Sequence, residues 1–119
     1  MYHITINIRA TSTIYTVTME YLDKGGTLHT KTLQGGVKST ANQNALQAAI
    51  DAVSILKGIC LIEIHTDNDY LAGAVRNGWL KSWQENGWKS AKGGAVKHQD
   101  KWQQLAALMT RHTVRFTKL

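Results

Sequence analysis

The hydrophobic period of the chain changes at Gly35-Gly36, and this change constrains the fold more than any other feature. Before the two glycines, apolar and polar residues alternate, which is typical of half-buried strands. Short turns rich in Gly, Asp or Thr separate the alternating segments. They therefore predict an antiparallel meander of three strands. The segments cover residues 2–9, 14–22 and 27–33.

A helical period takes over after the glycines. Apolar residues recur every three to four positions over residues 42–57, which predicts an amphipathic helix. Thr40 or Asn42 is a candidate N-cap for this helix. Gly58 is expected to end it.

The second half of the chain alternates between strands and helices. Residues 59–64 are almost all apolar, as in a buried strand, and residues 113–118 form a second strand pattern. A short helix is expected from a cap at Asp67 or Asn68 through about residue 75, and Asp100 is expected to cap another. A polar stretch lies between them. The order predicts one domain over residues 1–119 with an α/β fold, in which helices pack on the faces of a mixed sheet.

Composition is that of a soluble globular protein. Hydrophobic residues make up 43% and charged residues 18%. No apolar run reaches the ~20 residues that span a bilayer, and the first residues lack the layout of a signal peptide. Cys60 is the one cysteine and lies in an apolar run, so it is interpreted as a small buried hydrophobe. We expect an intracellular, cytoplasmic protein with no membrane partner.

Positive charge is concentrated in the last third of the chain. Residues 1–75 hold five Lys/Arg and six Asp/Glu, whereas residues 76–119 hold nine Lys/Arg and two Asp/Glu. All four tryptophans lie in this basic part. Interleaved cations and aromatic rings favour a polyanion partner such as nucleic acid. The alternative is a solvated charged face whose tryptophans anchor the core.

Four segments resemble a known family, the type 1 ribonucleases H of the ribonuclease H-like superfamily. Residues 64–70 read Ile-His-Thr-Asp-Asn-Asp-Tyr, similar to the family's Thr-Asp-Ser-x-Tyr motif. Residues 77–89 repeat the tryptophan spacing of the family's basic protrusion, expected here over about residues 76–98. Residues 96–105 contain Asp-x-Trp-x-x-Leu, and residues 40–46 resemble its Thr-x-Asn-x-x-Glu-Leu helix start.

The resemblance implies a reaction for which this chain lacks most of the required acids. The family cleaves the RNA strand of RNA–DNA hybrids with two divalent ions, Mg²⁺ or Mn²⁺, held by four carboxylates. Only Asp67 matches one of them. The first strand has no acid and carries Arg9 near the expected position, and the helix acid corresponds to Ala45. The fourth acid would follow the last strand, and the sequence ends at Leu119. The resemblance therefore implies a degenerate, catalytically inactive domain.

Other acids are weak substitutes for the missing ones. Asp69 fits a solvated residue in the first turn of a helix, although it could join Asp67 in a weak metal site. Glu63 is interpreted as a buried, paired acid, and Asp51 lies on the polar side of the first helix. His65 could face the same cleft but is interpreted as a core or surface histidine. The five histidines show no metal-binding spacing.

The binding residues implied by the resemblance are better preserved. One group lies at the first helix and after the fourth strand, where the family contacts the backbone and minor groove. The other lies on the protrusion, where the family holds the DNA strand. Trp83 and Trp102 are instead interpreted as anchors to the core. The implied binding residues are Thr40, Asn42, Asn68, Trp79, Trp88, Lys89 and Lys97.

Three hypotheses follow. The first is an inactive domain that binds an RNA–DNA hybrid or another duplex and needs no cofactor for binding. The second is a metal-dependent ribonuclease H completed by a second subunit or by substitute acids. The third is a protein-interaction or dimerisation module, with a homodimer or partner covering the sheet face left by a missing C-terminal helix.

Overall fold

The computed structural model describes residues 2–89, 94 and 96–118. Its centre is one five-stranded sheet formed by β1 (Tyr2–Ala10), β2 (Tyr15–Leu22), β3 (Leu28–Gly35), β4 (Cys60–Thr66) and β5 (Thr113–Lys118). The strand order is β3-β2-β1-β4-β5, with β1, β2 and β3 antiparallel and β4 parallel to both β1 and β5. The predicted α/β class with a mixed sheet is confirmed.

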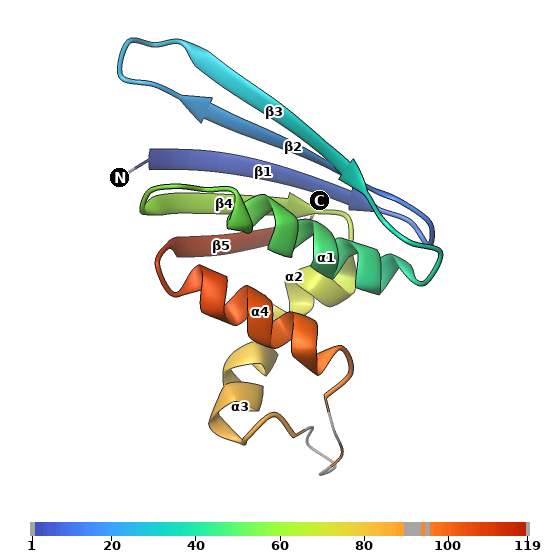
Figure 1. Cartoon of the computed structure of the whole chain (residues 1–119). Helices are drawn as coiled ribbons and strands as arrows, with labels where there is room; N and C mark the ends of the chain where they lie inside the picture. The colour runs from blue at the N-terminus through green and yellow to red at the C-terminus, as the bar shows by residue number, and fades with distance from the viewer. Residues whose placement is uncertain (1, 90–93, 95, 119) are drawn as a thin grey trace.

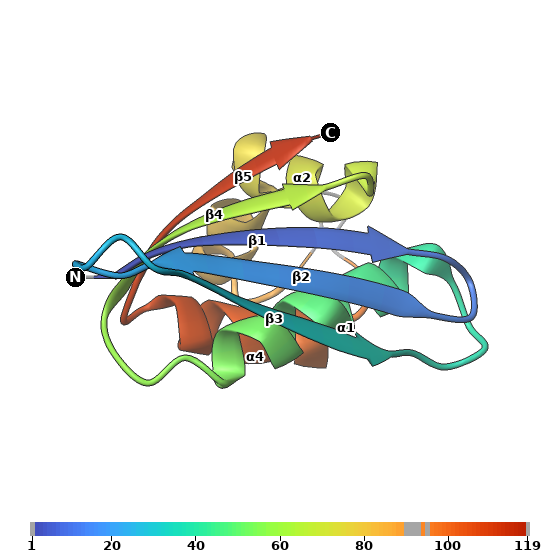
Figure 2. The ribbon, with the colours of Figure 1, turned by 90° about the horizontal axis from the view of Figure 1, so that it is seen from above.

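The helices lie on one side of the sheet (Figures 1 and 2). They are α1 (Ala41–Ser54), α2 (Asp69–Arg76), α3 (Trp79–Glu85) and α4 (Gln99–Met109). Figure 1 shows α1 and α4 beneath the sheet and α3 farthest from it. None of the helices in the described residues is both long and apolar enough to cross a membrane.

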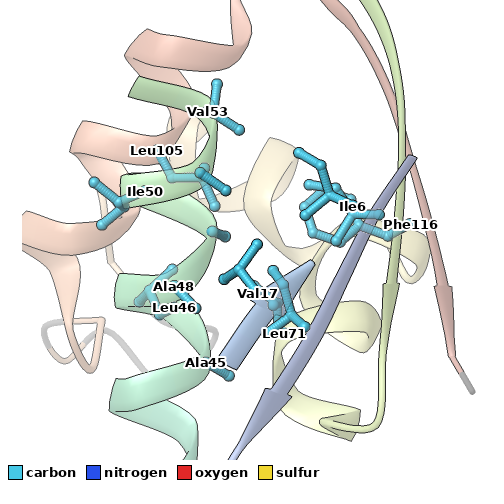
Figure 3. Close-up of a cluster of buried hydrophobic side chains, with 14 of the residues drawn as sticks. Ile6, Val17, Ala45, Leu46, Ala48, Ile50, Val53, Leu71, Leu105 and Phe116 are labelled. Carbon is cyan, nitrogen blue, oxygen red and sulfur yellow. The ribbon is translucent and has the colours of Figure 1, made fainter. Parts of the chain in front are cut away.

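The core fills the space between the sheet and the two helices α1 and α4. Ile6 and Val17 from the sheet meet Leu46 of α1 and Leu105 of α4 (Figure 3). All four are fully buried. Cys60 is buried at the start of β4, as its apolar neighbours predicted.

The start of α1 follows the prediction, and its end does not. Thr40 is the N-cap, and its hydroxyl accepts a hydrogen bond from the Gln43 amide at 3.1 Å. The helix ends at Ser54, three residues before the predicted end, and Gly58 lies beyond it. The Ser54 hydroxyl donates to the carbonyl of Asp51 at 2.8 Å, which helps to satisfy a carbonyl at the helix end.

The polar stretch contains a helix that periodicity did not predict. Helix α3 has only seven residues and is flanked by Gly78 and Gly87, whose φ angles of 75° and 69° are left-handed. Helix α4 is capped by His98, with a φ of 59°, and Asp100 lies in its first turn, so the predicted cap at Asp100 was wrong. Residues 90–93 and 95 of the predicted protrusion lie outside the described residues.

The sheet face opposite the helices carries polar side chains at its centre. Thr5 lies between Glu20 of β2 and Glu63 of β4, and Glu63 is paired with Arg115 of β5. Figure 2 looks onto this face, and no described helix covers it. The centre of the face therefore does not present the apolar patch that a docked helix would bury.

Candidate nucleic-acid interface

Arg9 and Asp67 lie side by side at the carboxyl ends of two parallel strands. The register pairs Ile8 with Thr66, so the next residue of each strand is Arg9 and Asp67. Nη1 of Arg9 is 4.0 Å from Oδ2 of Asp67, and the two side chains are 71% and 39% exposed. A cation therefore stands beside the one carboxylate that matches the family motif.

Two other candidate acids, Asp69 and Glu63, also lie beside basic side chains. Oδ1 of Asp69 is 3.6 Å from Nζ of Lys118. Oε1 of Glu63 is 3.9 Å from Nη1 of Arg115, and the Glu63 side chain is 47% exposed, so this acid is paired as predicted but is not buried.

Asp51 is committed to a different part of the molecule. Its carboxylate accepts hydrogen bonds from the Tyr15 hydroxyl and from Nε2 of Gln47, the latter at 2.8 Å. Burial first, and then the hydrogen bond to Asp51 and its charge, raise the pKa of Tyr15 to about 12. Asp51 therefore cannot serve as a ligand beside Asp67.

The residues present do not fit a two-metal centre. Ala45, at the position of the family's helix acid, is fully buried and belongs to the core cluster (Figure 3). Within the described ranges, no group of three or more His, Cys, Asp or Glu side chains could hold a metal ion. Two adjacent ions need several oxygen ligands at fixed spacing, and the single carboxylate of Asp67 beside Arg9 does not supply them.

Asn68 joins the starts of the two helices that border this edge. Its Oδ1 accepts a hydrogen bond from the Leu71 amide at 2.8 Å and so caps α2. Its Nδ2 donates to Oδ1 of Asn42 at 3.0 Å, and its backbone amide donates to the Thr66 hydroxyl at 3.1 Å. Asn68 is only 9% exposed, and its bonds hold the start of α2 against the start of α1.

Asn44 is a positioning residue that sequence reasoning missed. Its side chain is 1% exposed, and Oδ1 accepts from the Val37 amide at 3.1 Å. Its Nδ2 donates to the carbonyls of Thr11 and Val37, each at 2.9 Å. These bonds fix the loop after β1 against the loop before α1. The only sequence feature that indicated this role of Asn44 is its place, as a polar residue, within an apolar stripe of the helix.

Trp83 and Trp102 pack in or against the core, as the sequence suggested. Trp102 is fully buried, and its indole N–H donates to the Tyr70 hydroxyl at 2.8 Å. Trp83 packs on it with ring centroids 5.7 Å apart. Burial raises the pKa of Tyr70, and its hydroxyl donates to the Lys97 carbonyl at 3.2 Å.

The predicted protrusion, about residues 76–98, holds most of the remaining candidate contacts. Trp79 is 46% exposed and borders a hollow of about 470 Å³ that Arg76 and Lys118 also line. Trp88 is half-buried, with a left-handed φ of 65°, and its amide donates to the Trp83 carbonyl at 2.7 Å. Exposed basic side chains follow it at Lys89 and Lys97. Thr40 and Asn42, by contrast, lie at the start of α1.

The chain matches the protein family described as RNase H over residues 9–119. A ribonuclease H from Chlorobium chlorochromatii is 43% identical over 81 residues, which are 68% of this chain and 56% of that protein. The chain thus spans little more than half the length of that relative.

Solved structures give the same fold. LC9-RNase H1, described as a type 1 RNase H with the type 2 active-site motif, superposes on 100% of this chain and 63% of its own with a TM-score of 0.84 and 18% identity. LC11-RNase H1, solved in complex with an RNA/DNA hybrid, matches 100% of this chain and 85% of its own with a TM-score of 0.58 and 13% identity.

Proposed function

The chain belongs to the ribonuclease H family, and we propose that it is an inactive member that binds RNA–DNA hybrid or another duplex without cleaving it. The observation that carries this proposal is Arg9, which lies 4.0 Å from Asp67 at the edge where the resemblance implies a metal-binding acid.

Electrostatics argue against cleavage by this chain alone. A divalent ion beside Asp67 would also lie near the Arg9 guanidinium, which repels it. Ala45 offers no oxygen ligand, and Asp69 is paired with Lys118. The remaining carboxylate binds Mg²⁺ or Mn²⁺ too weakly to hold two ions.

The basic residues in the last third of the chain favour binding to a polyanion. Residues 76–119 carry a net charge of +7, from nine basic and two acidic residues. Arg76, Lys89 and Lys97 lie exposed on or beside the protrusion, together with Trp79. Basic side chains neutralise phosphates, and rings stack on bases or sugars. Because LC11-RNase H1 was solved with an RNA/DNA hybrid, a hybrid is the first ligand to test. Its A-form geometry suits recognition by shape, phosphates and 2′-hydroxyls.

The test is a cleavage and binding assay on a labelled RNA–DNA hybrid, with Mg²⁺ and then Mn²⁺, beside an Asp67→Ala variant. We expect no cleavage by either protein, together with a gel shift that persists in EDTA. Metal-dependent cleavage that the variant loses would show a nuclease instead, with ligands from Asp69, Glu63 or a second subunit. Absence of any shift at ~50 mM salt would contradict the binding proposal.

Self-association is a second candidate function, favoured by an apolar end of the sheet far from Arg9. A groove of about 230 Å³ lies there and is lined by Tyr2, Met19 and Tyr21 among others. Leu22 and Leu28, paired across the β2–β3 hairpin, are 61% and 57% exposed beside it.

We propose a second copy of the chain as the occupant. The charged residues around this end, Lys24, Lys31, Glu20 and Asp23, are balanced in sign, so two copies related by a two-fold axis can meet without net repulsion. Light scattering should give twice the chain mass for the wild type and a monomer for Leu28→Lys. A monomeric wild type at ~100 μM would contradict self-association.

A further inference from the structure

We propose that the Arg9 guanidinium binds a phosphodiester of the nucleic-acid strand at the carboxyl ends of β1 and β4, without a metal ion. This inference rests on the proposed binding function and assigns the phosphate-binding group at its centre. Arg9 is then a ligand-binding residue, and Asp67 is the residue that orients it.

The register fixes where Arg9 lies. Ile8 and Thr66 are the last paired residues of β1 and β4, and both are buried. Arg9 follows Ile8 and still pairs with Thr16 of β2, so strand alternation puts its side chain on the open face of the sheet. There it lies beside Asp67 at the carboxyl ends of β1 and β4, and 71% of its side chain is exposed. A strand approaching this edge meets the guanidinium first.

The ion pair leaves most of the guanidinium available. An arginine has five N–H donors in a planar fork that matches two phosphate oxygens. Only Nη1 approaches Asp67, and at 4.0 Å the contact is too long for a hydrogen bond. An exposed pair of this kind contributes little stability. It can still limit the directions in which the side chain points.

Hydrogen bonds fix the segments on both sides of Arg9. The Thr11 carbonyl and the Ser12 carbonyl, just after β1, are hydrogen-bonded to Asn44 and to the Ser39 amide, at 2.9 and 2.7 Å. These bonds hold the end of β1 against the start of α1. On the other side, Asn68 opens α2 directly after Asp67. Arg9 is therefore carried by a part of the fold whose neighbouring segments are held in place.

The chain offers a matched control for this residue. Arg115 is 73% exposed, and its Nη1 lies 3.9 Å from Glu63, so its exposure and pairing closely resemble those of Arg9. It lies on the same open face of the sheet but opposite Glu63, four residues before Asp67 along β4, and so away from the carboxyl ends of β1 and β4. Removing either charge changes the net charge of the protein equally.

The experiment compares hybrid binding by wild type, Arg9→Gln and Arg115→Gln in EDTA and in Mg²⁺, at several salt concentrations. We expect Arg9→Gln to weaken binding about five- to tenfold at ~100 mM salt and to lower the slope of log K against log salt by about 0.9, the loss of one phosphate contact. Arg115→Gln should stay within about twofold of wild type. The wild type should bind in EDTA at least as tightly as in Mg²⁺, because Mg²⁺ competes with the protein for phosphates.

The possible outcomes distinguish failure of the Arg9 assignment from failure of the proposed binding function. If the wild type binds no hybrid, the proposed function fails. If the wild type binds and both variants bind alike, the function stands and Arg9 is not the phosphate ligand. Binding that needs Mg²⁺ would also overturn the inference, because a metal ion would then be neutralising the phosphate.

Discussion

Asn68 donates a hydrogen bond from Nδ2 to Oδ1 of Asn42 at 3.0 Å, which ties the first turn of α2 to the first turn of α1. Asn68 also caps α2 through its own Oδ1. The two asparagines that the sequence singled out as ligand contacts are therefore partners of each other. Their structural and binding roles have to be separated by measurement.

The Asn42→Ala variant separates the structural role of Asn42 from its binding role. Losing the bond to Asn68 should cost about 0.5–1.5 kcal/mol of unfolding free energy, because Asn68 keeps its capping bond. Hybrid affinity should fall several-fold if Asn42 also touches the backbone. Gln43→Ala is the control, since Gln43 lies in the same turn and bonds the Ser39 hydroxyl at 2.6 Å. Equal losses of hybrid affinity in both variants would show that Asn42 does not contact the nucleic-acid backbone.

The exposed lysines of the protrusion should carry the salt dependence of binding. Lys89→Glu and Lys97→Glu should each weaken hybrid binding and reduce the slope of log K against log salt by about one. Lys57→Glu makes the same charge change at an exposed position between α1 and β4, outside the predicted protrusion, and should leave the slope unaltered. Fluorescence anisotropy between ~50 and ~200 mM salt measures this. A slope that falls equally in all three variants would indicate a general charge effect.

The fold could be predicted because its strands and longer helices have clear periods. Strand β5 was predicted at its observed bounds, and the alternation in β1 and β2 gave their buried face directly. Helix α3 could not be predicted, because seven residues with one buried side chain, Leu80, carry too little pattern.

The candidate site was less predictable, because its geometry depends on tertiary contacts. The sequence showed that Arg9 stands near a missing acid, but only the register of β1 and β4 puts it beside Asp67. No local pattern indicated that Lys118 would pair with Asp69, because 49 positions separate them along the chain. Partners of charged side chains far apart in sequence follow from strand order, not from local pattern.

Asn44→Ala should be among the more damaging substitutions. It leaves the amide of Val37 and the carbonyls of Thr11 and Val37 without their partner in a buried place. An unsatisfied buried group costs about 1–3 kcal/mol, so we expect a loss of at least ~2 kcal/mol in urea unfolding. Asn86→Ala, on the exposed end of α3, should change stability by less than ~0.5 kcal/mol. A loss below ~1 kcal/mol for Asn44→Ala would mean that the loops are held by other contacts.

Tyr15 should make the fold sensitive to alkaline pH. Its side chain is 5% exposed, and burial together with Asp51 raises the pKa of its hydroxyl from 10.0 to about 12. Since the folded pKa lies above the unfolded value, this contribution to stability is complete below pH 10 and is lost as the pH rises towards 12. A difference of two pKa units corresponds to about 3 kcal/mol.

The Tyr15→Phe variant tests whether Tyr15 causes the alkaline sensitivity of the fold. The variant should lose about 1–2 kcal/mol at pH 7, where the bond to Asp51 is missing, and should then decline less than the wild type above pH 10. Tyr21→Phe, at the apolar end of the sheet, should keep the wild-type decline. Urea unfolding between pH 7 and about 11.5 gives both quantities. Parallel curves for the wild type and Tyr15→Phe would place the alkaline sensitivity in another group, because a phenylalanine has no proton to lose.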